Sequence, residues 1–183
     1  MKNIFIIIAF LFISISLNAQ KSNSGFDYRF GIGNSFLGTG DMLGVMYENE
    51  INCSINNYLS TGISLGYGKS DYGVSATASF LQYNLNVFFS PFKNSKRNDF
   101  RVGMGFSSLK ISDAYMSSAS WINNELIDTD YVFDLRKTFG YNFIIENTYS
   151  ITDKFLLGLK LYTQPYGNGD INSGILLKMG VRL

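Results

Sequence analysis

The chain has 183 residues, enough for one domain, and its formal net charge of +1 lacks the basic excess that nucleic-acid-binding proteins carry. It contains 16 Phe, 12 Tyr and 18 Gly but only 2 Pro, a composition that suits many strands and few irregular segments. The absence of histidine excludes catalysis by an imidazole, and the single cysteine excludes an internal disulfide.

Residues 1–19 have the order of a secretory signal peptide. Lys2 supplies a positive start, a run of apolar residues follows, and the small residue Ala19 offers a cleavage point. The apolar run is too short to cross a bilayer comfortably as a permanent helix. We therefore expect export, cleavage after Ala19 and a mature domain of residues 20–183. A retained anchor is the alternative.

Apolar and polar residues alternate with a period of two from Phe26 onward, which is the pattern of strands with two unlike faces. The alternation predicts eight strands, over 26–34, 43–55, 59–68, 80–89, 99–106, 139–149, 155–164 and 174–183. Short turns are expected at 56–58, 90–98 and 150–154, and longer loops near 35–41, 70–75, 111–138 and 165–170. The segment 111–138 breaks the alternation and is the longest of these predicted loops.

The glycines are segregated to one face of the predicted strands. None lies on the apolar face, and twelve of the 18 lie on the polar face: Gly31, Gly33, Gly44, Gly62, Gly66, Gly68, Gly103, Gly105, Gly140, Gly158, Gly174 and Gly180. In a narrow barrel such glycines make room for large side chains opposite them, whereas on a solvated face they would only weaken the strands. The pattern therefore favours a membrane barrel with its apolar face toward lipid, over a soluble sheet with a solvated polar face.

Charged residues of both signs share the polar face, where they can pair inside a barrel and offset the cost of desolvation. We expect a lumen network made of Arg29, Glu48, Glu50, Arg101, Glu146, Lys160, Lys178 and Arg182. Paired carboxylates can perform acid–base chemistry, but basic partners are available to all three glutamates. The network is therefore expected to be structural.

Three lysines have the parity of the apolar face but lie where the strands leave the bilayer. They are Lys69, Lys110 and Lys137, on the side of the longer loops. If the first strand rises from the periplasm, this side faces the outside of the cell. Long lysine side chains can keep their stems in hydrocarbon and raise their ammonium groups to the interface. We expect them to contact outer-membrane lipid, namely the phosphates of lipopolysaccharide; the alternative is that they only solubilise strand ends.

Over Phe26 to Leu183 the chain resembles an OmpA/OmpX-type outer-membrane barrel, of the kind described as outer-membrane β-barrel or porin-family domains. The most specific part is the last strand, in which Met179, Val181 and Leu183 alternate to the final residue. Such barrels end on an apolar or aromatic residue that the barrel assembly machinery reads, more often Phe, so Leu183 is a departure. The resemblance implies an all-β, eight-stranded antiparallel up-and-down transmembrane barrel in the outer membrane of a Gram-negative-type envelope.

The sequence contains no motif for a catalytic, cofactor or metal site, and outer-membrane barrel enzymes characteristically use a histidine. We therefore expect no enzyme activity and no cofactor, but a structural or surface-interaction role without a wide pore. Trp121, Tyr115 and Tyr131 could contact an unidentified surface partner through the predicted loop 111–138. The alternatives are a narrow channel and a secreted, lipocalin-like lipid-binding barrel, which conductance measurements and cell fractionation respectively would identify.

Overall fold

The computed structural model describes residues 25–38, 42–71, 76–92, 97–122 and 125–183. Within these ranges the chain forms eight strands: β1 (Phe26–Gly38), β2 (Met42–Ser54), β3 (Leu59–Asp71), β4 (Ala76–Phe89), β5 (Asn98–Ile122), β6 (Glu125–Ser150), β7 (Phe155–Pro165) and β8 (Ile171–Arg182). In this part of the chain no helix is long and apolar enough to cross a bilayer. The signal peptide and cleavage site expected within residues 1–20 lie outside the described residues.

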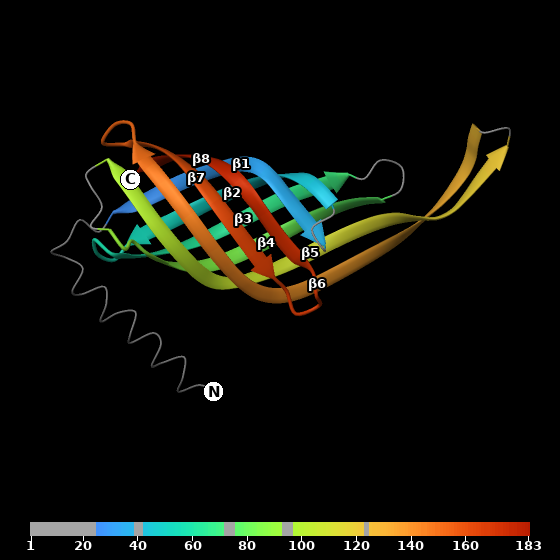
Figure 1. Cartoon of the computed structure of the whole chain (residues 1–183), viewed down its shortest axis with the longest axis horizontal. Coiled ribbons are helices and arrows are strands. Elements are labelled where there is room, and N and C mark those ends of the chain that lie inside the picture. The colour runs from blue at the N-terminus through green and yellow to red at the C-terminus, as the bar shows by residue number, and fades with distance from the viewer. Residues whose placement is uncertain (1–24, 39–41, 72–75, 93–96, 123–124) are drawn as a thin grey trace.

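Each strand pairs antiparallel with its neighbours in the sequence, and β8 pairs with β1, so the sheet closes into a barrel (Figure 1). This confirms the predicted all-β, up-and-down architecture. The connections from β2 to β3, from β4 to β5 and from β6 to β7 lie at one end of the barrel, which we call the turn end. The opposite end, from which β5 and β6 project in Figure 1, is the loop end.

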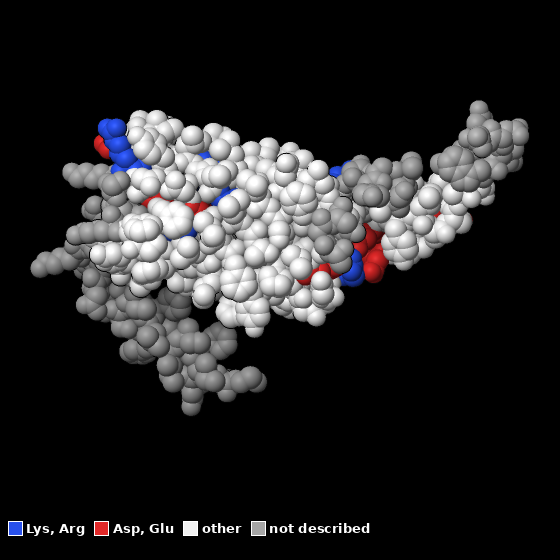
Figure 2. All heavy atoms as spheres, viewed as in Figure 1, with Lys and Arg blue, Asp and Glu red and all other residues white. Residues whose placement is uncertain are grey.

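Burial alternates along the strands in the sense opposite to that of a soluble protein. On β7, for example, the outward side chain of Leu159 is 49% exposed, whereas the inward side chain of Lys160 is 1% exposed. The same pattern of exposed apolar and buried polar residues runs through the wall, and uncharged residues cover most of the barrel face shown in Figure 2. The outer wall is therefore suited to hydrocarbon and the interior to polar groups.

Glycines on the inner face lie against the largest interior side chains, as the alternation predicts. A Cβ added at Gly103 would lie 2.6 Å from the ring of Phe88, and one added at Gly68 would overlap the ring of Phe80. Both rings are fully buried. An eight-stranded barrel has an interior that side chains just fill, so the large rings are accommodated only because the residues opposite them have no side chain.

The prediction of a long loop over 111–138 is wrong. Strands β5 and β6 continue through this segment as an antiparallel hairpin, paired from Ile111 with Arg136 to Ile122 with Glu125 and interrupted by two register shifts. β4 accompanies β5 only as far as Tyr115. Above that point both faces of the hairpin are away from the barrel, so no alternation of apolar and polar residues is required there. β1, β3 and β4 also extend further toward the loop end than predicted.

We expect Gly68→Ala to lower the free energy of unfolding by about 1–3 kcal/mol, because the added methyl group overpacks the site against Phe80. The measurement is urea unfolding of the refolded barrel. In a double-mutant cycle with Phe80→Leu, the loss caused by Gly68→Ala should become smaller. Gly167→Ala is the control, since its Cβ would meet only the Phe139 carbonyl oxygen at 3.6 Å. An equal loss with and without the Phe80 ring would contradict this packing.

Candidate functional site

The charged interior residues form a layer nearer the turn end of the barrel. Its centre is a pair of glutamates on β2, each contacted by two lysines. The ammonium group of Lys160 lies 2.7 Å from Glu48 and 3.1 Å from Glu50, and that of Lys178 lies 3.2 and 2.8 Å from the same two carboxylates. Strands β7 and β8 are thereby joined across the lumen to β2.

Two arginines extend this layer across the lumen through Glu146 on β6. Arg101 donates from the same Nη2 atom to Glu50 at 2.9 Å and to Glu146 at 3.0 Å. Its guanidinium carbon lies 3.8 Å from the centre of the Phe88 ring, a cation–π contact. Arg29 forms ion pairs with Glu146 and, at 2.6 Å, with Asp27.

The layer therefore combines the acids Asp27, Glu48, Glu50 and Glu146 with the bases Arg29, Arg101, Lys160 and Lys178, all of them buried. Each buried charge has an opposite charge within contact distance, which offsets the cost of removing it from water. Asp27 is not among the residues that we expected in the network. It lies two residues before Arg29 and therefore on the same inward face of β1, which could have indicated its place there. Asn52, Ser64 and Thr148 also donate hydrogen bonds to these carboxylates.

Arg182 does not join this layer, contrary to the expectation from its parity. Its guanidinium donates to the Ser150 hydroxyl at 2.7 Å and to the Asp153 carbonyl oxygen at 3.3 Å. Arg182 is the last residue of β8, so its side chain lies at the turn end of the barrel, past the charged layer. The position of Arg182 in the alternating pattern correctly predicts that it is on the inward face of β8, but it does not predict how far along the barrel axis the side chain lies.

Toward the loop end the lumen is filled by a second, uncharged layer. Tyr166 shares a hydrogen bond of 2.8 Å with Ser107 and donates to Gln164 at 2.9 Å, and Gln164 donates in turn to Asn84 at 3.1 Å. Asn172 donates to Gln82 at 2.8 Å. These groups pack with the buried apolar side chains of Leu37, Met46, Phe80, Leu109, Ile111 and Leu176.

Neither layer offers an obvious catalytic group. All three buried glutamates contact basic side chains, so none is left as an unpaired general base. In the part of the chain that the structure describes, no three His, Cys, Asp or Glu side chains are placed to hold a metal ion.

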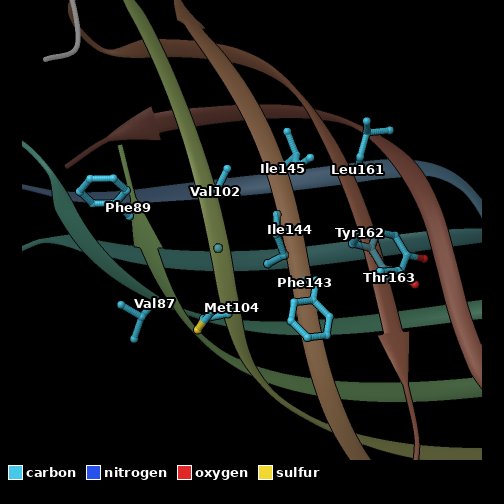
Figure 3. A pocket seen from close by; sticks show the side chains of 11 residues that line it. Val87, Phe89, Val102, Met104, Phe143, Ile144, Ile145, Leu161, Tyr162 and Thr163 are labelled. Carbon is cyan, nitrogen blue, oxygen red and sulfur yellow. The ribbon is translucent and has the colours of Figure 1, made fainter. Parts of the chain in front are cut away.

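The outer wall carries two shallow apolar grooves. The first, of about 580 Å³, runs across β4 to β7, and Figure 3 shows Val87, Met104, Phe143 and Leu161 among its lining side chains. The second, of about 570 Å³, crosses the wall from β1 to β6. Both are lined mainly by the exposed side chains of the apolar outer face.

The three rim lysines are exposed on the outward face, but they do not form one cluster. Lys110 on β5 and Lys137 on β6 are directly paired in the register of the hairpin. Lys69 on β3 is paired with Val45 and Ser79 and is separated from Lys110 by β4. The structure therefore divides the predicted set into a pair and a single lysine.

The base of the hairpin is held by a charged cluster at the loop end. Arg136 on β6 forms ion pairs with Asp113 on β5 and, at 3.4 Å, with both Asp134 and Asp170. Asp170 belongs to the connection between β7 and β8, so this cluster ties the hairpin to the neighbouring connection at the barrel mouth. Acidic and basic atoms gather at this place in Figure 2.

Similar solved structures are small barrels from bacterial outer membranes. Ail, the attachment invasion locus protein of Yersinia pestis, has a TM-score of 0.58 and 10% identity, covering 87% of this chain and 99% of that chain. OprG of Pseudomonas aeruginosa has a TM-score of 0.58 and 9% identity, with 88% and 97% covered. Neisserial surface protein A has a TM-score of 0.57 and 10% identity, with 88% and 98% covered.

The chain has the fold of the small outer-membrane β-barrels. No protein-family model matches it, and no curated protein matches its sequence. At about one identical residue in ten, the likeness to these outer-membrane barrels concerns the backbone architecture and not a shared site. The chemistry of this barrel therefore has to be argued from its own side chains.

Glu146→Gln should lower the free energy of unfolding by about 3 kcal/mol, because it leaves Arg29 and Arg101 in a sealed interior without one of their counter-charges. Urea unfolding in lipid or detergent measures the loss. Asp153→Asn removes one carboxylate charge from an exposed turn and should change the stability by less than about 0.5 kcal/mol. Equal stability of Glu146→Gln and native protein would mean that the charged layer does not hold the barrel together.

Proposed function

We propose that this chain is an integral protein of a Gram-negative-type outer membrane that presents the β5–β6 hairpin at the cell surface as a contact site for another molecule, without forming a wide pore. The observation that carries the proposal is the combination of a filled barrel with a hairpin that extends past every other strand. The filled barrel gives the hairpin a fixed base, and among the described strands β5 and β6 project furthest from the barrel (Figure 1).

The outer wall supports the membrane location. A transmembrane strand needs about 9–11 residues, and the shortest strand, β7, has 11. The exposed side chains around the wall are predominantly apolar, which would be costly in water and is favourable in hydrocarbon. The outer-membrane proteins that share this fold support the same location.

The two interior layers support a role other than solute transport. Ion pairs join β1, β2, β5, β6, β7 and β8 through the charged layer, and amide and tyrosine side chains fill the lumen nearer the loop end. A solute would have to break these contacts to pass. A porin-like function is therefore not favoured by the described interior.

The hairpin supports a contact role because β6 exposes large apolar side chains beyond the last of its residues that pairs with β7. Phe133 is 77% exposed and Leu135 is 65% exposed, on the same face of β6. Exposed aromatic and aliphatic residues on a rigid element are typical of interaction surfaces. Ail, which is named the attachment invasion locus protein, has the same fold.

A cysteine in the hairpin should react with a membrane-impermeant thiol reagent on intact cells, whereas a cysteine at the turn end should not. The variants are Ser118→Cys in β5 and Asn57→Cys in the turn between β2 and β3, both exposed and both made in a Cys53→Ser background. After the cells are opened, both should be labelled. Labelling of the Asn57 variant alone on intact cells would reverse the orientation and overturn the proposal.

The purified barrel should raise the conductance of a planar bilayer no further than its empty-detergent control, because its lumen is filled. A general porin inserted in the same bilayer serves as the positive control. Stable single-channel steps from the native chain would contradict the absence of a pore and favour the narrow-channel alternative.

A further inference from the structure

Lys110 and Lys137 form an unusual pair on the outer wall. They are directly opposite each other in the register of β5 and β6, and both side chains are exposed on the outward face. Neither forms an ion pair with any described residue. Side chains in such a position have their Cβ atoms about 4.5–5.5 Å apart, and like charges there destabilise the strand pair. An anion bound between them would remove this repulsion.

An apolar groove begins directly beneath this pair. Two residues nearer the turn end, Ser108 on β5 is paired with Phe139 on β6, and both line the groove of about 570 Å³. The groove continues over exposed apolar residues of β3 to β5: Leu65, Tyr83, Leu85 and Phe106. The ammonium group of Lys137 lies 5.3 Å from the centre of the Phe139 ring, so one positive charge is held at the upper end of the groove.

We infer that this place binds a phosphate-bearing anionic lipid, with its phosphate between Lys110 and Lys137 and one acyl chain in the groove below. The pair of ammonium groups complements a phosphate with two negative charges, and charge-assisted hydrogen bonds of this kind are the strong ones. The apolar groove selects a lipid over a free phosphate ion. Lys69 has no lysine opposite it and lies across β4, so it is not part of this site.

The inference rests on the proposed membrane location, and insertion of the native chain into bilayers tests that location separately. The barrel is reconstituted in phosphatidylcholine bilayers with increasing phosphatidic acid, and the urea midpoint of unfolding gives the apparent affinity. We expect Lys110→Gln/Lys137→Gln to weaken this affinity about tenfold or more, since both charge-assisted contacts to the phosphate are lost. Lys69→Gln, the matched control, should retain the native affinity.

The sign of the effect should reverse when the lipid carries no net negative charge. In pure phosphatidylcholine, Lys110→Gln should be at least as stable as the native chain, because it removes the repulsion from Lys137. Inorganic phosphate added to phosphatidylcholine bilayers should not reproduce the gain given by phosphatidic acid. Equal gains in the native chain and the double variant, equal losses in Lys69→Gln and the double variant, or an equal gain from inorganic phosphate would each overturn the inference.

Discussion

The narrow interior of an eight-stranded barrel is the constraint on which the other features of this protein depend. Within the barrel wall, every second residue points into a space that side chains just fill, so large and small side chains have to be matched across the lumen. Glycines opposite Phe80 and Phe88 meet this requirement where the rings lie, and the paired charges meet it where polar groups are enclosed. The residues on either side of each inward residue point outward. In this chain these outward residues are mostly apolar, and together they form the outer wall.

The strands and their two faces could be predicted from the sequence because alternation with a period of two directly records which residues face hydrocarbon. Alternation does not indicate how far along the barrel axis a residue lies. For this reason the sequence places Arg182 in the charged layer, although its side chain lies at the turn end. The pairing of Lys110 with Lys137 also depends on the register between strands, which neither strand specifies alone. The sequence predicts a loop where the hairpin lies, because a ribbon without a buried face has no reason to alternate between apolar and polar residues.

The two layers of the lumen stabilise the barrel through different interactions. In the charged layer, a few carboxylates each contact bases from several strands, so the loss of one group affects partners on opposite walls. In the uncharged layer, neutral hydrogen bonds and apolar packing act over shorter distances. Arg136 then continues the ionic pattern above the lumen, where it links the hairpin to the connection between β7 and β8.

The seam between β1 and β8 has a consequence for how the barrel is made. Its pairs, from Asp27 with Arg182 to Gly38 with Ile171, join opposite ends of the described chain. Contacts this distant in sequence carry a large loop-closure cost and form slowly. Until they form, the sheet has two open edges whose unpaired amides can recruit other chains. Closure is therefore expected to be a late, cooperative step of assembly, and a chain halted before it would be prone to aggregation while still lacking only one ladder of hydrogen bonds.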